Sequence, residues 1–240
     1  MLINVDVKGL EVSCAAFLSG DKVLIQELMD GVDIHGDNQA KFGLPTRLIA
    51  KTLVFRILYG GTEYSFAQDP EFTGVSKRAS YWKDVIDKFY TKYDGLHTWH
   101  KELVDNVVLT GKYTSPVGRE YYFKPYTSDR GELKWPRTNI LNYPVQGFGN
   151  DIMSLMRISL YNRLKKLKLQ SVKLIATVHD SILLDVPNDL IKQVVDILQA
   201  VATDVPGNFK KVFGVQYLLP FLIEIETGMD YSNMEIYNAN

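Results

Sequence analysis

The chain has 240 residues, 46% of them hydrophobic, and a formal net charge of −1 at pH 7. This composition excludes a disordered or fibrous chain and is sufficient for one large domain or two smaller ones. No apolar stretch approaches the length of a membrane helix and no signal peptide is evident, so a cytoplasmic protein with no membrane partner is expected. The single cysteine, Cys14, allows no internal disulfide and has the neighbours of a packed core thiol.

The first predicted element is a strand that ends in an acid. Residues Leu2 to Val5 are apolar and β-favouring, and Asp6 follows them. Its carboxylate is therefore expected to project from the tip of a buried strand. A single Asp at a strand end is ordinarily a solvated turn residue, so Asp6 indicates a functional site only in combination with other residues. Helical patterns follow, including Asp21 to Met29.

A helix is predicted over residues 45–61, with proline and threonine at its start and paired glycines at its end. Two cations and two aromatics recur in it every four residues. With about 3.6 residues per turn they form one slowly drifting stripe. Its members are Arg47, Lys51, Phe55 and Tyr59. Cations beside the positive helix N-terminus form an anion site that suits a triphosphate, and the aromatics offer flat faces to a base. For an isolated helix, a solvated cationic face beside core aromatics is the alternative.

Further helices are predicted over Arg78–Tyr93, Thr98–Leu109 and Val145–Lys168. His97 and His100 have a spacing that suits metal binding on a helix. No cysteine or acid set completes a zinc site, so they are interpreted as surface or core histidines.

A hairpin with an acid at its turn is predicted next. Two apolar strands, Val172–Val178 and Ile182–Val186, flank the polar tripeptide that contains Asp180. If this hairpin neighbours the first strand, Asp180 and Asp6 converge. Such hard oxygen ligands suit Mg²⁺, and two ions together support an in-line phosphoryl displacement.

The C-terminal part is predicted to contain a helix over Asn188–Thr203 and an alternating strand over Phe221–Thr227. This strand places Glu224 and Glu226 on one face, and it is expected beside the Asp180 hairpin if the family arrangement described next applies.

Taken in order, these motifs resemble the C-terminal part of a family A DNA polymerase, especially its phage members, over essentially the whole chain. The matching blocks are Asp6–Glu11 for the first palm motif, Asp33–His35 for the entry to the fingers, the stripe for the fingers helix, Asn142–Gly147 for the segment that reaches template and primer, and Val178–Ser181 for the last palm motif. The resemblance implies an α+β fold, with a palm of antiparallel sheet and helices over 1–32 and 136–240, helical fingers over 33–135, and no thumb or exonuclease.

The resemblance also implies the chemistry of a DNA-dependent DNA polymerase. Asp6 and Asp180 would hold two Mg²⁺ ions, for which Mn²⁺ is a substitute. Arg47 and Lys51 would bind the phosphates of a deoxynucleoside triphosphate, with Lys51 also protonating the departing pyrophosphate. His35 would add a phosphate contact.

The remaining implied roles concern the base, the sugar and the DNA. Phe55 would stack beside the incoming sugar and base, and a phenyl group here implies poor use of dideoxynucleotides. Tyr59 would hold the template side, and Glu11 would exclude a ribose 2′-hydroxyl. The residues implied at the primer–template end are Asn142, Gln146 and His179.

Ser181 departs from the family pattern, because many relatives carry a second acid there. His-Asp-Ser also resembles single-subunit RNA polymerases, but Glu11 argues against them because they keep a small residue at that gate. A non-catalytic nucleic-acid-binding assembly subunit is a further alternative. A nuclease is disfavoured, because hydrolysis needs no triphosphate-binding helix.

The net charge of −1 is low for a protein that binds primer–template DNA. The family places the thumb and the exonuclease before the first palm motif, which here begins at Asp6. We therefore expect a second polypeptide that carries these regions, or a longer product of which this chain is a fragment.

Overall fold

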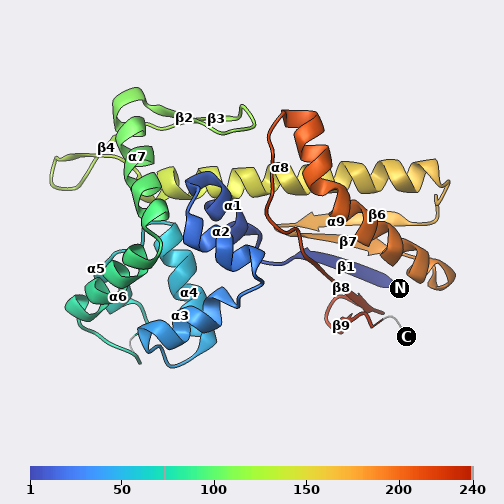
Figure 1. The fold of residues 1–240 in the computed structure, drawn as a ribbon, viewed down its shortest axis with the longest axis horizontal. Coiled ribbons are helices and arrows are strands. Elements are labelled where there is room, and N and C mark those ends of the chain that lie inside the picture. The colour runs from blue at the N-terminus through green and yellow to red at the C-terminus, as the bar shows by residue number, and fades with distance from the viewer. Residues whose placement is uncertain (73, 239–240) are drawn as a thin grey trace. The chain divides into compact units, whose positions relative to one another are not determined.

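The computed structural model describes residues 1–72 and 74–238, and it divides into two compact units (Figure 1). Unit 1 comprises Met1–Leu10 and Gly147–Asn240, and unit 2 comprises Glu11–Gln146. The palm and fingers limits expected at residues 32 and 135 stay predictions. No helix in the described part of the chain is both long and apolar enough to cross a membrane.

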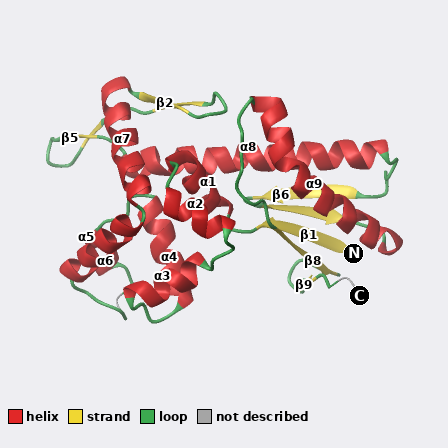
Figure 2. Ribbon diagram, viewed as in Figure 1, coloured by secondary structure: helices red, strands yellow, loops and turns green. Residues whose placement is uncertain are grey.

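Unit 1 is built on a five-stranded antiparallel sheet (Figure 2). In spatial order its strands are β6 (Lys173–Val178), β7 (Ser181–Asp185), β1 (Leu2–Val7), β8 (Ile223–Gly228) and β9 (Glu235–Ile236). In β1, Ile3, Val5 and Val7 are buried, whereas Asp6 lies partly buried on the opposite face. This alternation gives the sheet an apolar face and a polar face.

Two helices supply the rest of the unit 1 core. They are α8 (Arg137–Lys166), from Gly147 onward, and α9 (Ile191–Phe213), which follows the 3₁₀ turn η1 (Asn188–Leu190). Phe148 of α8 packs edge-on against Phe209 of α9 at 5.3 Å, and Tyr217 completes an aromatic cluster 6.0 Å from Phe209. All three side chains are almost fully buried, so they anchor both helices.

Unit 2 is mainly helical. Its elements are α1 (Leu10–Ser19, from Glu11 onward), α2 (Lys22–Met29), α3 (Ile34–Phe42), α4 (Arg47–Leu58), α5 (Glu63–Gln68), α6 (Ala79–Lys92), α7 (Asp94–Thr110), the hairpins β2 (Lys112–Thr114) with β3 (Glu120–Tyr122) and β4 (Tyr126–Thr127) with β5 (Leu133–Lys134), and the first part of α8. Phe66, Phe72 and Trp82 form a buried aromatic cluster in it, with ring centroids 5.0–5.4 Å apart.

Two sequence expectations about these elements are wrong. The helix expected to begin at Val145 begins at Arg137 and contains Pro144. Ile140 and Leu141 lie in a buried cluster with Leu103 and neighbouring residues, so burial of apolar surface offsets the backbone hydrogen bond that proline cannot make. The strand β8 pairs with β1 and β9 rather than lying beside the β6–β7 hairpin, because β1 separates them. The expected antiparallel sheet with helices and the β6–β7 hairpin are confirmed.

Candidate active site

The two acids singled out in the sequence lie together at one end of the sheet of unit 1. Asp6 pairs across the strands with Ser181 of β7, and the backbone carbonyl of Asp180 accepts a 3.0 Å hydrogen bond from the Val7 amide. Burial, then the charge of Asp180 and a hydrogen bond with its side chain, raise the pKa of Asp6 to about 6. The charge of Asp180 therefore opposes ionisation of Asp6.

Two glutamates of β8 add negative charge near Asp6, but each has its own partner. Glu224 lies opposite Asp6 and forms a 2.6 Å ion pair with Lys8. The Glu226 carboxylate accepts a 3.1 Å hydrogen bond from the side-chain amide of Asn4. Within the described residues no group of three or more histidine, cysteine or acidic side chains is arranged to hold a metal. A two-carboxylate site fits Mg²⁺, which needs only one or two protein carboxylates beside water and phosphate.

The turn that carries Asp180 has an unusual backbone. Val178, the last residue of β6, pairs with Ser181, the first residue of β7, and the Ser181 hydroxyl donates a 3.0 Å hydrogen bond to the Val178 carbonyl. Between them, His179 has a φ of 53°, a left-handed conformation that costs a residue with a side chain about 1–2 kcal/mol. The His179 ring nitrogen Nδ1 lies 3.5 Å from Asp180 Oδ1, so the strained residue contacts the acid.

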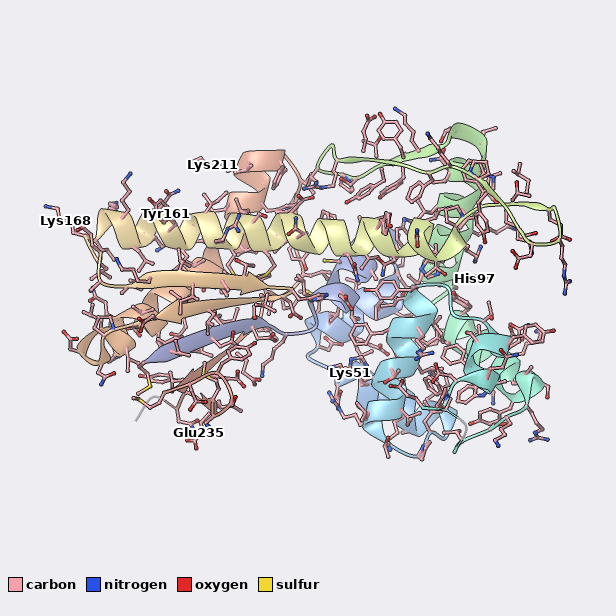
Figure 3. The ribbon with its side chains drawn as sticks, turned by 180° about the vertical axis from the view of Figure 1, so that it is seen from behind. Lys51, His97, Tyr161, Lys168, Lys211 and Glu235 are labelled. Carbon is pink, nitrogen blue, oxygen red and sulfur yellow. The ribbon has the colours of Figure 1, made fainter. Side chains whose placement is uncertain are left out.

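In unit 2, α4 presents the predicted stripe beside its buried face. Thr46 caps the helix by accepting a 3.2 Å hydrogen bond from the Ile49 amide. The buried side chains recur at helical spacing, which turns the cations away from the core. They are Ala50, Leu53, Val54, Ile57 and Leu58. Both cations, Arg47 and Lys51, are exposed, and Lys51 projects from α4 (Figure 3).

His35 of α3 joins this stripe. Its ring centroid lies 5.8 Å from that of Phe55, and the Lys51 ammonium lies 5.8 Å from the same phenyl ring. Burial, followed by the charges of Arg47 and Lys51, lowers the pKa of His35 to about 4. His35 is therefore neutral at pH 7, and its buried Nδ1 has no hydrogen-bond partner among the described residues. The arrangement can bind an anion through its two cations.

A second group gathers where α4 ends. Tyr59 follows the last turn, and its buried hydroxyl lies near the side chains of Glu11 and Gln146, but it makes no well-aligned hydrogen bond to a described residue. Burial, then the charge of Glu11, raise the pKa of Tyr59, so the phenol stays protonated. Asn142 lies one turn before Gln146 on α8 and is partly buried.

The predicted site residues thus form two groups, one in each unit. Asp6, His179 and Asp180 belong to unit 1. The members in unit 2 are Glu11, His35, Arg47, Lys51, Phe55, Tyr59, Asn142 and Gln146. Sequence reasoning placed Asp33 in the block at the entry to the fingers but gave neither Asp33 nor Lys8 a chemical role. Each of them forms an ion pair beside one of the two groups. Lys8 pairs with Glu224, which is far along the chain, and Asp33 pairs with Arg47 of α4. The only local signal was that Asp33 lies two positions before His35.

The model of the family "DNA polymerase family A" matches residues 1–233. A DNA polymerase I of Caldicellulosiruptor bescii is 32% identical over 224 residues, which are 86% of this chain and 25% of the relative. A thermostable DNA polymerase I of Thermus filiformis is 28% identical over 238 residues, 95% of this chain and 26% of the relative. The chain therefore spans about a quarter of the length of these relatives. They are bacterial, and they give no support to the expected likeness to phage members.

A solved structure shares the fold. It is described as the POL domain of Pol1 from M. smegmatis in complex with DNA primer-template and dNTP. Its TM-score is 0.77 at 20% identity, and the match covers 93% of this chain and 38% of that one. The family match extends over nearly the whole chain, and the shared fold agrees with the expected antiparallel sheet with helices. The chain belongs to DNA polymerase family A.

Proposed function

We propose that this chain is the catalytic portion of a DNA-dependent DNA polymerase that transfers deoxynucleotides to a primer 3′-hydroxyl. The observation that carries the proposal is the convergence of Asp6 and Asp180, two acids 174 positions apart in the sequence, at one end of the sheet. Family membership and the cationic stripe of α4 support it.

The carboxylates of Asp6 and Asp180 would hold two Mg²⁺ ions, with Mn²⁺ as a substitute. When bound, the ions lower the charge repulsion between primer and triphosphate and favour attack by the 3′-hydroxyl. Burial, and after it the charge of Asp180, raise the pKa of Asp6, and a divalent cation would offset both by favouring the ionised carboxylate. The ion pair of Glu224 with Lys8 leaves Asp6 and Asp180 as the principal ligands.

The residues of unit 2 would bind and select the nucleotide. Arg47 and Lys51 would bind the phosphates, and Lys51 would donate a proton to the leaving pyrophosphate. His35, neutral at pH 7, would contribute a hydrogen bond to the phosphates rather than charge. Phe55 would pack beside the sugar and base.

Other site residues would select the sugar and contact the DNA. Glu11 would exclude a ribose 2′-hydroxyl, and its charge lies near the buried Tyr59 hydroxyl. Tyr59 would hold the template side. Asn142, Gln146 and His179 would contact the primer–template end. A second polypeptide with thumb and exonuclease regions, a phage origin and a cytoplasmic location stay predictions.

The test is Asp180→Asn in primer extension with Mg²⁺ and deoxynucleoside triphosphates. We expect nucleotide addition to fall about 100-fold or more, because one of two metal-binding carboxylates is lost, while primer–template binding is retained. Asp185→Asn is the matched control, because Asp185 lies at the other end of β7 and is exposed there. It should retain full activity.

Two outcomes would redirect the assignment. If the chain acts in an assembly with a second polypeptide, unchanged nucleotide addition by the assembly that carries Asp180→Asn would place catalysis elsewhere and favour a non-catalytic assembly subunit. Efficient, primer-independent incorporation of ribonucleotides by the unmodified chain would favour an enzyme like the single-subunit RNA polymerases, against the role given to Glu11.

A further inference from the structure

Asp33, directly before α3, holds Arg47 of α4 by one edge of its guanidinium. Arg47 Nε donates to Asp33 Oδ2 at 2.7 Å, and Arg47 Nη2 donates to Asp33 Oδ1 at 2.8 Å. A guanidinium carries five N–H groups in a flat fork. This side-on pairing uses two of them and leaves the terminal edge, with both hydrogens of Nη1 and one of Nη2, without a partner among the described residues.

The ion pair contributes little to folding stability. Its side chains are 56% and 52% exposed, and water screens an ion pair that is exposed to this extent. Its effect is on orientation, because two parallel hydrogen bonds fix a long side chain that otherwise samples many rotamers. The hydrogen bond from Arg47 is the main cause that lowers the pKa of Asp33 to about 2, so the acid is ionised throughout the neutral range.

Gly36 provides the space that this pairing needs. A Cβ atom added at Gly36 would lie 2.6 Å from Asp33 Oδ2, the oxygen that accepts from Arg47 Nε. Any larger residue at position 36 would therefore require the Asp33 carboxylate to shift from the position in which it accepts the hydrogen bonds of Arg47. The arrangement involves three positions, namely an acid, a cation and the glycine that leaves room for their contact.

We propose that Asp33 is a positioning residue for nucleotide binding, which clamps Arg47 along its Nε edge so that the terminal edge stays open to two oxygens of the triphosphate. This inference rests on the proposed function. Arg47 lies at the start of the stripe that carries Lys51, beside His35. A fixed, open guanidinium edge binds phosphate with less loss of conformational entropy than a mobile arginine.

The test is a double-mutant cycle on the full chain, with equilibrium binding of dATP and Mg²⁺ as the readout. Asp33→Asn should weaken dATP binding about 3- to 10-fold, and Arg47→Gln should weaken it more. When Arg47 is already glutamine, Asp33→Asn should change the affinity less than about twofold, since its target is gone. In primer extension, Asp33→Asn should raise the KM for dATP with kcat within about twofold of the unmodified chain.

Two further variants separate orientation from charge. Gly36→Ala keeps every charge and improves helix propensity, yet it should weaken dATP binding in the same direction as Asp33→Asn. Asp87→Asn is the matched control, because Asp87 forms an exposed 2.6 Å ion pair with Lys83 in the same unit. It should leave dATP binding unchanged.

The outcomes distinguish this inference from the proposed function. Weaker dATP binding in Arg47→Gln, together with unchanged or tighter binding in Asp33→Asn, would overturn the positioning role alone. Unchanged dATP binding in Arg47→Gln would overturn both the positioning role and the assignment of the phosphates to α4.

Discussion

His100 of α7 is fully buried, with its Nδ1 3.1 Å from the Tyr90 hydroxyl. Its Nε2 has no hydrogen-bond partner within the described residues. Burial, then the charges of Arg137 and His97, lower the pKa of His100 to about 3. By contrast, His97 is exposed and stacks on Tyr90 at 4.5 Å. The pair read from the sequence as surface or core histidines therefore contains one of each.

The lowered pKa of His100 predicts acid sensitivity. In the unfolded chain His100 binds a proton near pH 6.5, whereas in the folded chain it stays neutral until about pH 3. Unfolding therefore takes up a proton between these values, and the stability present above pH 6.5 falls as the pH falls. Tyr90, His97 and Arg137 face the ring and stay in place in His100→Gln.

Urea unfolding at pH 7 and pH 4.5 measures this effect. Between pH 7 and pH 4.5, the free energy of unfolding of the unmodified chain should fall by about 2 kcal/mol more than that of His100→Gln. His97→Gln, at an exposed ring, should lose as much as the unmodified chain. Equal losses in all three proteins would show that His100 does not titrate as proposed.

At the scale of elements, a buried polar network joins α2, α3 and α6. Lys92, whose side chain is 5% exposed, forms ion pairs with Glu27 at 2.8 Å and Asp37 at 2.7 Å. The Tyr93 hydroxyl donates to Glu27 at 2.7 Å, and the Asn38 amide donates to the Tyr93 oxygen at 3.2 Å. Since α3 also packs against α4, this network fixes the base on which Asp33 and His35 are held.

Removing the buried cation should therefore destabilise the protein. Lys92→Met leaves Glu27 without its cation, and we expect a loss of about 3 kcal/mol in the free energy of unfolding. Lys83→Met, which breaks an exposed pair, should cost far less than Lys92→Met. Adding Glu27→Leu to Lys92→Met should recover part of the loss, because no unpaired buried acid remains. Equal losses in Lys92→Met and Lys83→Met, measured by urea unfolding, would contradict the network.

Local patterns predicted most elements, and long-range packing decided the rest. The start of α4 followed from Thr46 as a cap, and the β6–β7 hairpin followed from two apolar runs around Asp180. The early start of α8 did not follow, because the buried contacts of Ile140 outweigh the local signal of Pro144. The ion pair between Asp33 and Arg47 could not be predicted either, because it depends on how α3 packs against α4 and not on residue spacing within either helix.

At the scale of the whole molecule, the compact units do not follow the order of the chain. Unit 1 takes both chain ends, so Asp6 and Asp180 come from its two separate segments. Glu11, only five residues after Asp6, belongs to unit 2 with Tyr59 and Gln146. Because the net charge is only −1, binding of a polyanion depends on where charges lie. The carboxylate pair in unit 1 is a concentration of negative charge that a divalent cation would offset.

This charge arrangement predicts opposite effects of one substitution on stability and on metal response. Without metal, Asp180→Asn should be more stable than the unmodified chain by about 1 kcal/mol, because Asp6 no longer faces a charged neighbour and both groups are partly exposed. With Mg²⁺ at tenfold its Kd, the unmodified chain should gain about 1.4 kcal/mol, since the ion binds only the folded state. Asp180→Asn should gain little, whereas Asp185→Asn should gain as much as the unmodified chain. Thermal unfolding with and without Mg²⁺ measures all three. Equal Mg²⁺ stabilisation of Asp180→Asn and the unmodified chain would place the ion away from the β6–β7 turn.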